Sequence, residues 1–304
     1  MISVIISTLN RPEKIQECLK KILASDVSDF EVIIVDQSKG YSTKSVVKQL
    51  GSAKIVYSKM NTKGKSKGLN DAVKRASGEI LAFTDDDCLV EKHWLKNIHH
   101  ALKEHKNIVG VFGQVLPHEP FLNKGKLCPG IFVSTKERII TKPTPHWKYI
   151  GFGNNMAFKR EVFRKMGLFK EWLGPSAIGL AAEDAEFAQR VLLSGFKILR
   201  DPKVKVYHDR WLTKKEFQKQ MWAYSCGELA CYGYFAMRGE QFAKKIVSDN
   251  FRDSHKKLKG SIKSLLHFQR SGVKQLYHTA IEFFFKLRGL GIGYLFFKKE
   301  SRNQ

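Results

Sequence analysis

An apolar run that ends in three consecutive aspartates constrains this chain more than any other stretch. Ile80–Thr84 is short, apolar and preceded by Gly78, which predicts a buried strand. Asp85, Asp86 and Asp87 follow at once, and adjacent carboxylates repel one another unless a cation lies beside them. Open α/β sheets bind ligands at the carboxyl ends of their strands. We therefore expect a divalent cation at this point, with a solvated acidic turn as the alternative.

Strands and helices alternate along the first two thirds of the chain. Apolar runs predict strands at 2–7, 30–35, 55–57, 80–84, 108–116, 150–158, 196–199 and 204–207. Apolar residues at helical spacing predict helices after Pro12, after the Lys- and Gly-rich loop 63–68, and at 94–102, 160–166 and 184–194. The stretch 117–147 reads as an irregular insertion. This alternation predicts an α/β fold with a mainly parallel sheet and helices on both faces.

Composition and charge narrow the class of protein. The 304 residues are 43% hydrophobic and 27% charged, as in a globular protein with a substantial core. Five cysteines without a CxxC pair predict neither a zinc ribbon nor a disulfide framework, and they favour a reducing compartment. The chain begins with strand-like residues and no basic leader, so we expect no signal peptide and a cytoplasmic location. The net charge of +24 predicts a polyanionic partner.

Five motifs, taken in order, resemble family 2 glycosyltransferases with the GT-A fold. They are Ser-Val-Ile-Ile-Ser-Thr-Leu-Asn-Arg-Pro at 3–12, Val-Ile-Ile-Val-Asp-Gln-Ser at 32–38, Gly-Glu-Ile-Leu-Ala-Phe-Thr-Asp-Asp-Asp at 78–87, Gly-Asn-Asn-Met-Ala-Phe-Lys-Arg at 153–160 and Glu-Asp-Ala-Glu-Phe-Ala-Gln-Arg at 183–190. The resemblance covers residues 2–210. It implies a Rossmann-like GT-A catalytic domain at 1–210, followed by a helical, basic, amphipathic region at 211–304. It also implies sugar transfer from a nucleotide-diphosphate sugar to a hydroxyl group, with inversion, in polysaccharide or glycoconjugate synthesis.

The resemblance assigns a metal site to the aspartates. Asp85 and Asp87 match the first and last acids of the family's DxD motif, so Asp87 is expected to bind Mn²⁺ or Mg²⁺ and Asp85 to contact the metal or the ribose. Asp86, at the middle position, is expected to face the donor. His208 lies where some relatives have a metal-binding histidine, and a structural histidine is the alternative. A bound metal would stabilise the diphosphate leaving group.

Further residues are expected to bind the donor, for which we predict a UDP-sugar. Thr8 and Arg11 follow the first strand, where the family holds the nucleotide, and Asp36 resembles the acid that contacts its base or ribose. Lys67 is expected to contact the phosphates, and Asn70 belongs to the same motif, although Leu69 stands where many relatives have Arg. Surface charges and turn residues are the alternative for this group.

The resemblance assigns proton transfer to the acids at the start of the helix 184–194. Asp184 is expected to be the general base that deprotonates the acceptor hydroxyl, with Glu183 orienting it or the acceptor. An acid that caps a helix is the alternative. Gly153, Asn154 and Asn155 are expected to line the sugar or acceptor pocket.

The last third of the chain combines basic residues with aromatic clusters, such as those at 283–288 and 295–299. Interfacial helices have this composition, so we expect the region to lie on the anionic inner face of the cytoplasmic membrane and to bring the enzyme to a glycan or lipid-linked acceptor. The alternative is that these aromatics pack on the catalytic domain or on a second subunit, while the lysines face water. Nucleic acid is not expected as a partner, because no recognised motif accompanies the charge. A sugar-nucleotide pyrophosphorylase and a non-catalytic nucleotide-sugar or polyanion-binding protein remain as other functions.

Overall fold

The computed structural model describes residues 1–104, 107–267 and 270–302, and these residues form two compact units. The first unit consists of Met1–Glu171 and Glu183–Phe217, and the second of Trp172–Ala182 and Gln218–Gln304. The sequence did not indicate that the segment 172–182 belongs with the C-terminal helices. The assignment of residues 1–210 as a catalytic domain stays a prediction.

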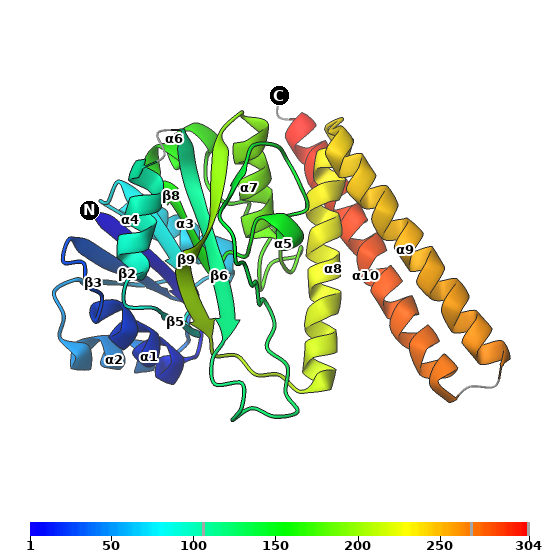
Figure 1. The fold of residues 1–304 in the computed structure, drawn as a ribbon, viewed down its shortest axis with the longest axis horizontal. Helices are drawn as coiled ribbons and strands as arrows, with labels where there is room; N and C mark the ends of the chain where they lie inside the picture. The colour runs from blue at the N-terminus through cyan, green and yellow to red at the C-terminus, as the bar shows by residue number, and fades with distance from the viewer. Residues whose placement is uncertain (105–106, 268–269, 303–304) are drawn as a thin grey trace. The chain divides into compact units, whose positions relative to one another are not determined.

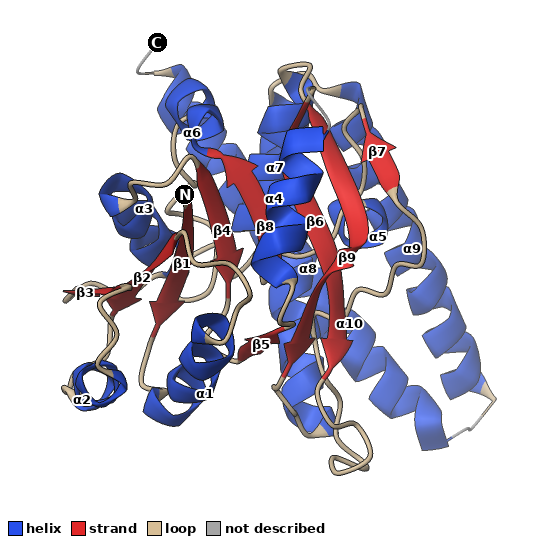
Figure 2. Cartoon of the chain, turned by 60° about the vertical axis from the view of Figure 1, so that its left-hand side comes forward, coloured by secondary structure: helices blue, strands red, loops and turns tan. Residues whose placement is uncertain are grey.

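The first unit is built on one sheet flanked by helices (Figure 2). Its strands are β1 (Ile2–Thr8), β2 (Phe30–Asp36), β3 (Ile55–Lys59), β4 (Ile80–Thr84), β5 (Cys88–Val90), β6 (Ile108–Pro117), β7 (Arg138–Ile140), β8 (Asn155–Lys159) and β9 (Lys197–His208). Its helices are α1 (Pro12–Leu23), α2 (Ser42–Leu50), α3 (Lys65–Arg75), α4 (Trp94–Glu104), α5 (His146–Tyr149), α6 (Arg160–Met166) and α7 (Glu183–Leu193). The predicted α/β fold is confirmed.

The order of strands in the sheet is β3-β2-β1-β4-β8-β6-β9-β5, and β7 pairs with β9. The strands β3, β2, β1 and β4 are parallel, whereas β8 runs antiparallel to both β4 and β6. Half of the sheet is thus the parallel arrangement that strand–helix alternation predicts, and the other half is mixed. Alternation along the chain does not report the direction of β8, because that direction depends on its distant neighbours.

Several boundaries differ from the sequence prediction. Residues 196–199 and 204–207 were expected as separate strands, but they form the single strand β9, whose register against β6 shifts between Gly113 and Gln114. The expected loop at 63–68 is mostly helical, because α3 begins at Lys65. The helix α2 was not predicted, and β8 begins at Asn155 rather than at residue 150.

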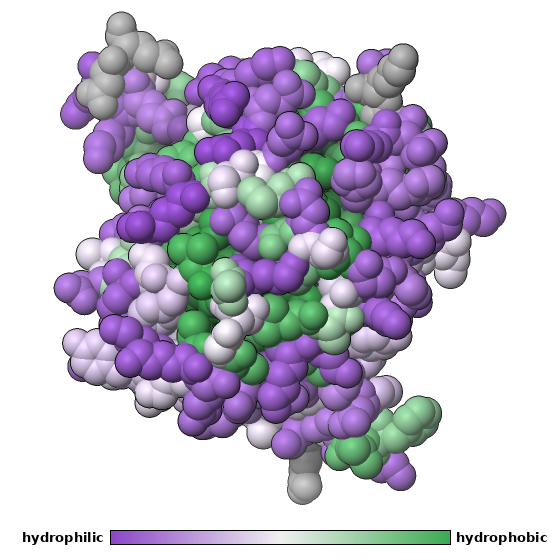
Figure 3. Space-filling view, turned by 90° about the vertical axis from the view of Figure 1, so that its left-hand side faces the viewer, coloured by the Kyte–Doolittle hydropathy of each residue, from purple (hydrophilic) through white to green (hydrophobic). Residues whose placement is uncertain are grey.

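Two apolar clusters cover the faces of the sheet. The first joins β1, β2 and β4 to α1 and α4 through side chains such as Leu19, Trp94 and Ile98, all fully buried. The second packs Phe158, Phe163 and related side chains against α7, where the rings of Phe163 and Phe187 stack with centroids 4.4 Å apart. The strands β1, β2 and β4 are in register, since Thr8 pairs with Asp36 and Ile5 pairs with Phe83. The two clusters support the carboxyl ends of these strands. On the face seen in Figure 3, hydrophilic side chains surround a smaller apolar area.

The second unit contains most of α8 (Lys214–Met237) together with α9 (Gln241–Leu266) and α10 (Arg270–Ser301). The helices α9 and α10 run side by side (Figure 1). Gly289 and Gly293 let α10 approach α8 closely, since a Cβ atom there would lie 2.2 Å and 2.5 Å from backbone oxygens of Cys226 and Ala230. None of the described helices is long and apolar enough to cross a bilayer.

The segment 172–182 packs on these helices and has an unusual backbone. The ring of Trp172 stacks on that of Phe296, with centroids 4.6 Å apart. Ser176, Leu180 and Ala182 have φ values of +65°, +68° and +74°. Such left-handed conformations cost about 1 kcal/mol or more for a residue with a Cβ atom, and they concentrate at functional sites. The strained segment leads directly into Glu183, the first residue of α7.

Candidate active site

The three aspartates lie in a turn between β4 and β5, so their side chains do not alternate as they would in a strand. The Cys88 amide donates to the Asp85 carbonyl at 3.1 Å, which closes the turn. Asp86 and Asp87 consequently share one cation, Arg11, whereas Asp85 points to a different one. In an extended strand Asp85 and Asp87 would point the same way, and the turn explains why they do not.

Arg11 and Thr8 hold the second and third aspartates. One guanidinium nitrogen of Arg11, Nη1, lies 2.9 Å from Asp86 and 2.7 Å from Asp87, and the Thr8 hydroxyl donates to Asp86 at 2.7 Å. Burial and the adjacent charge of Asp87 raise the pKa of Asp86 to about 6. The structure therefore brings Thr8 and Arg11 to the aspartates, as the sequence predicted for a common site.

His208, at the end of β9, faces Asp87. Its Nε2 atom lies 3.2 Å from Asp87 Oδ1, and its Nδ1–H donates to the Pro129 carbonyl at 2.8 Å. Although burial opposes it, the hydrogen bond with Asp87 raises the pKa of His208 to about 10. The same hydrogen bond lowers the pKa of Asp87 against the effect of burial.

This pair fits a divalent metal ion. A backbone carbonyl that accepts from Nδ1–H fixes the tautomer in which Nε2 can bind a metal, an arrangement common around metal-binding histidines. Asp87, Cys88 and His208 place one ligand atom each within 4.8 Å of one another. Burial raises the pKa of the Cys88 thiol well above its ordinary value, and this side chain belongs to the apolar core. The ligands that fit are therefore the carboxylate of Asp87 and the imidazole of His208.

Lys65 connects the aspartates to the acids of α7. Its Nζ atom lies 2.6 Å from Asp85 Oδ1 and 3.4 Å from Glu183 Oε1. Against the effect of burial, these two carboxylates raise the pKa of Lys65. Burial also raises the pKa of Glu183, to about 7, although Lys65 acts in the opposite direction. The predicted metal-binding acids and the predicted catalytic acids are thus one lysine side chain apart.

Sequence reasoning did not identify Lys65. It predicted a contact with the donor phosphates for Lys67, and that contact stays a prediction. Residues two apart in a helix point in nearly opposite directions, so only one of these lysines can face the acids. Lys67 makes no ion pair within the described part of the chain. The start of α3 at Lys65, one residue after Gly64, is the signal that could have identified Lys65 as the lysine that faces the acids.

Asp184 is held by backbone amides at the start of α7. Its Oδ2 atom accepts from the Gly153 amide at 2.5 Å, and its Oδ1 atom accepts from the Ala185 amide at 2.8 Å. A Cβ atom at residue 153 would lie 2.8 Å from the Cβ atom of Asp184, so this position requires glycine. These bonds fix the carboxylate while leaving lone pairs on both oxygens.

The two asparagines after Gly153 have different environments. Asn155 is fully buried, and its amide bonds to Trp94 and to the carbonyls of Gln114 and Val204. Asn154 is 5% exposed, and its Oδ1 atom has no hydrogen-bond partner among the described residues. An unsatisfied buried oxygen is costly in the free protein and suits a site that gains a donor from a ligand. Asn154 is therefore the better candidate for a ligand contact.

Asp36, at the end of β2, is completely buried and fully engaged. It accepts hydrogen bonds from the Ser38 amide at 2.9 Å and from the Tyr57 hydroxyl at 2.7 Å, and it pairs with Lys59 at 3.2 Å. These bonds lower the pKa of Asp36 against the effect of burial. Tyr57 and Lys59 were not predicted, although alternate residues of β3 necessarily share one face.

Asn70 is also engaged within the fold. Its amide donates to the Phe169 carbonyl at 2.9 Å and accepts from the Phe169 amide at 2.9 Å. It therefore fixes α3 to the backbone after α6. A direct contact of Asn70 with a donor stays a prediction.

Comparisons with known proteins agree with this geometry. The family described as "Glycosyl transferase family 2" matches residues 3–167. The glycosyltransferase AglE of Haloferax volcanii is 32% identical over 100 residues, which are 31% of this chain and 33% of that protein. The glucosyl-dolichyl phosphate glucuronosyltransferase of the same organism is 23% identical over 225 residues, 71% of each chain. The match to AglE thus spans only a third of that relative's length.

A solved structure shares the fold over most of the chain. The mannosyltransferase PcManGT from Pyrobaculum calidifontis, solved in complex with GDP-Man and Mn²⁺, has a TM-score of 0.63 and 18% sequence identity. The match covers 94% of this chain and 86% of PcManGT. At this level of identity the similarity shows a common GT-A fold and nothing finer.

Proposed function

The chain belongs to glycosyl transferase family 2, and we propose that it transfers a sugar from a nucleotide-diphosphate sugar to a hydroxyl acceptor with inversion. The observation that carries this proposal is the chain of ion pairs Asp85–Lys65–Glu183, with distances of 2.6 Å and 3.4 Å. It joins the aspartates, which suit the binding of a metal and a diphosphate, to the acids of α7, which suit proton transfer. A transferase that displaces a nucleoside diphosphate needs both groups at one site.

Asp87 and His208 would hold a Mn²⁺ or Mg²⁺ ion, with Asp85 or Asp86 turned to the metal or to the ribose. A divalent ion, when bound, neutralises charge on the diphosphate leaving group. Arg11 pairs with Asp86 and Asp87, and when a metal takes over these carboxylates its partly exposed side chain would turn toward a phosphate as a bidentate donor. Lys67 is proposed as a second phosphate contact.

Asp184 is proposed as the general base, with Glu183 orienting the acceptor. The acceptor hydroxyl gives its proton to a carboxylate oxygen of Asp184 while its oxygen forms the new glycosidic bond to the anomeric carbon. The bond between that carbon and the diphosphate oxygen breaks, and the nucleoside diphosphate leaves with the electron pair. Attack from the face opposite the leaving group inverts the anomeric carbon. The amides of Gly153 and Ala185 support this role because they hold the carboxylate in place.

The donor is proposed to be a UDP-sugar, with Asp36, Thr8 and Asn70 on the nucleoside side and Asn154 at the sugar. PcManGT was solved with GDP-Man, so the test must compare bases. The acceptor is proposed to be a glycan or a lipid-linked sugar. The relative that acts on glucosyl-dolichyl phosphate supports a lipid-linked acceptor, and the basic C-terminal helices support a position on the inner face of the membrane.

Thermal stabilisation of the full chain tests this proposal. UDP, GDP, ADP and CDP are each added with Mn²⁺, with Mg²⁺ and with a chelator. We expect one diphosphate to raise the melting temperature only when a metal is present, since a ligand at 100 times its Kd adds about 3 kcal/mol to the stability of the folded state. If no diphosphate gives metal-dependent stabilisation, the proposed donor site is wrong.

A further inference from the structure

The C-terminal hairpin of α9 and α10 presents an apolar surface to solvent. On α9, Leu258, Ile262, Leu265 and Leu266 are 38%, 43%, 38% and 71% exposed. Their spacing of four, three and one residues places them on one face of the helix. Four exposed aliphatic side chains on one face are unusual for a helix whose opposite side already packs on the protein.

A longer apolar stripe runs along α10. Val273, Tyr277, Phe284 and Leu287 are 64%, 60%, 62% and 46% exposed, and they recur at intervals of four, seven and three residues. Leu295, 60% exposed, continues the stripe toward the C-terminus. From Val273 to Leu295 the stripe is about 33 Å long, which is close to the thickness of a bilayer core, about 30 Å.

Both stripes lie on the same side of the hairpin. Ser254 and Ser261 of α9 face α10, where they contact Lys286 and Thr279. From these inward positions, helical geometry places the exposed residues of each helix on the side away from α8. The edge-to-face contact of Phe251 with Phe283, with centroids 5.8 Å apart, joins the two helices on that side. We call this surface the outer face of the hairpin, defined by Leu258, Ile262, Leu265, Leu266, Val273, Tyr277, Phe284, Leu287 and Leu295.

The other aromatic residues of the C-terminal clusters pack within the second unit. The ring of Phe285 stacks on that of Trp222, with centroids 6.1 Å apart, and Phe296 stacks on Trp172. Part of each aromatic cluster is therefore engaged within the second unit. Phe284 and Leu295 remain on the outer face.

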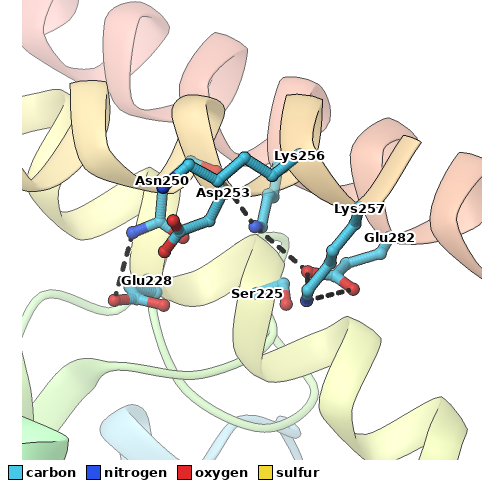
Figure 4. A pocket seen from close by; sticks show the side chains of 8 residues that line it. Ser225, Glu228, Asn250, Asp253, Lys256, Lys257 and Glu282 are labelled. Atoms are coloured by element: carbon cyan, nitrogen blue, oxygen red, sulfur yellow. Dashed lines mark hydrogen bonds and ion pairs between the residues drawn. The ribbon is translucent and has the colours of Figure 1, made fainter. Parts of the chain in front are cut away.

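The lysines of the hairpin also differ in whether they pair within the second unit or face solvent. Lys286 is 4% exposed, donates to the Ser254 hydroxyl at 2.9 Å and pairs with Glu282, which also pairs with Lys257. Lys286, Glu282 and Lys257 border a cavity of about 380 Å³ among the three helices (Figure 4). Lys286 is thus held inside the second unit, and Lys257 shares the carboxylate of Glu282 with it.

The acidic side chains of the hairpin are directed away from the outer face. Glu282 and Asp253 line the cavity, Glu300 bonds to the Tyr234 hydroxyl, and Asp249 pairs with Arg252. These are the four carboxylate side chains between residues 241 and 301.

Cations border the outer face instead. Lys244, Lys259 and Lys298 are exposed, and helical spacing puts all three on the same side as Ile262 or Phe284. The outer face is thus apolar with a cationic border among the described residues. Two copies of this surface placed face to face would bring like charges together, whereas an anionic bilayer complements both its charge and its apolar side chains.

We propose that the outer face of the α9–α10 hairpin is the membrane-binding surface, with its apolar side chains inserted among the lipid headgroups of an anionic bilayer. This inference rests on the proposed peripheral membrane location and is independent of sugar transfer. The hairpin lies in the interface and does not cross it, in keeping with the absence of a sufficiently apolar long helix among the described residues. Contact with lipid would bury the apolar side chains of the outer face, Phe284 and Leu287 among them, while the lysines select anionic headgroups.

Vesicle flotation of the full chain tests the surface. The double variant Phe284→Ser/Leu287→Ser removes two exposed apolar side chains, and Tyr41→Ser is the matched control because Tyr41 is equally exposed, at 67%, in the first unit. Vesicles are phosphatidylcholine alone or phosphatidylcholine with phosphatidylglycerol. We expect the unmodified chain and Tyr41→Ser to float with anionic vesicles, and the double variant to bind them at least about 100-fold more weakly, or about tenfold for each side chain. Circular dichroism and melting confirm that each variant is folded.

Three outcomes would overturn the proposal. The first is equal flotation of the double variant and the unmodified chain. The second is loss of flotation in Phe121→Ser/Leu122→Ser alone, since these residues form another exposed apolar site, 84% and 77% exposed. The third is a chain that ignores vesicles but changes from dimer to monomer in light scattering when Phe284 and Leu287 are replaced, which would assign the surface to a second copy.

The charge requirement and the enzyme are checked separately. Lys244→Glu/Lys259→Glu should weaken binding to anionic vesicles and make the remaining binding less sensitive to salt; unchanged binding would contradict the role of the cationic border. Metal-dependent stabilisation by a nucleoside diphosphate should be the same in all of these variants. If flotation fails while that stabilisation persists, the membrane surface is wrong and the proposed transferase is unaffected.

Discussion

Replacing Lys65 with methionine tests the link between the two groups of acids. The substitution keeps the length of the side chain and removes the charge that lies 2.6 Å from Asp85 and 3.4 Å from Glu183. Breaking a buried ion pair by removing one partner costs about 3–5 kcal/mol. Water screens part of this cost, because the side chains of Lys65 and Asp85 are 18% and 28% exposed. We therefore expect a loss of about 2 kcal/mol at neutral pH, or about 4–8 °C in melting temperature for a unit of this size.

The loss of stability in Lys65→Met should depend on pH. Burial raises the pKa of Glu183 to about 7 in the folded protein, above its unfolded value, so its contribution to stability is greatest at acidic pH and is lost as the pH rises through about 7. Lys65 lowers this pKa, so the variant should have a still higher one. At pH 6 Glu183 takes up a proton and needs no cation, so the part of the cost that comes from Glu183 is small and the part that comes from the lost pair with Asp85 remains. At pH 8 Glu183 is charged in the unmodified fold, where Lys65 compensates it, whereas the variant must bury the carboxylate without a cation or take up a proton, and either destabilises the folded state.

Melting curves at pH 6, 7, 8 and 9, recorded with a chelator and without nucleotide, provide the measurement. Lys67→Met is the matched control, because it removes the same charge two residues away, where no ion pair exists within the described residues. Its free energy of unfolding should stay within about 0.5 kcal/mol of that of the unmodified chain at every pH. A loss in Lys65→Met that equals the loss in the control, or that does not grow with pH, would refute the proposed link.

The other predictions concern the reaction itself. Asp87→Asn should abolish metal-dependent stabilisation by the nucleoside diphosphate, because the carboxylate ligand is lost; calorimetry that still detects this binding would exclude Asp87 as the metal ligand. Asp184→Asn should reduce transfer by about 10²–10⁴-fold at unchanged donor affinity, the usual contribution of a general base; if Glu183→Gln shows this pattern and Asp184→Asn does not, Glu183 is the base. Gly153→Ala should reduce transfer by about tenfold or more, because the added Cβ atom lies 2.8 Å from the Cβ atom of Asp184, whereas Gly40→Ala, with nothing within 4 Å, should be silent. Equal transfer by both glycine variants in a radiolabelled-sugar assay would show that the position of Asp184 is not critical.

Local patterns in the sequence determined the elements and the family. Apolar runs such as Ile2–Thr8 and Ile80–Thr84 form strands, because their side chains are buried wherever the strands lie. The acids at 85–87 and 183–184 stand at the ends of elements, which is a property of the chain itself. Residues 3–12, 32–38 and 78–87 also carried a correct resemblance to the family.

Contacts between distant segments decided the direction of β8 and the partners of the site residues. The antiparallel pairing of β8 with β4 and β6 depends on hydrogen bonds between segments more than 40 residues apart in the sequence, as in the pairs Ala82–Ala157 and Val111–Ala157. Asp36 was identified from its position, but Tyr57 and Lys59 became its partners only when β3 paired with β2. Composition and spacing do not report such neighbours.

Orientation within a helix separated residues that the sequence treats alike. Lys65 and Lys67 have the same chemistry and stand two positions apart, yet only Lys65 faces Asp85, because a rotation of about 200° separates them on α3. Likewise, Phe284 and Phe285 are adjacent, and one is exposed while the other packs on Trp222. The sequence by itself therefore determined which elements and chemical groups the protein has, whereas the tertiary structure decided which groups meet, because packing fixes the face of each helix and the neighbours of each strand.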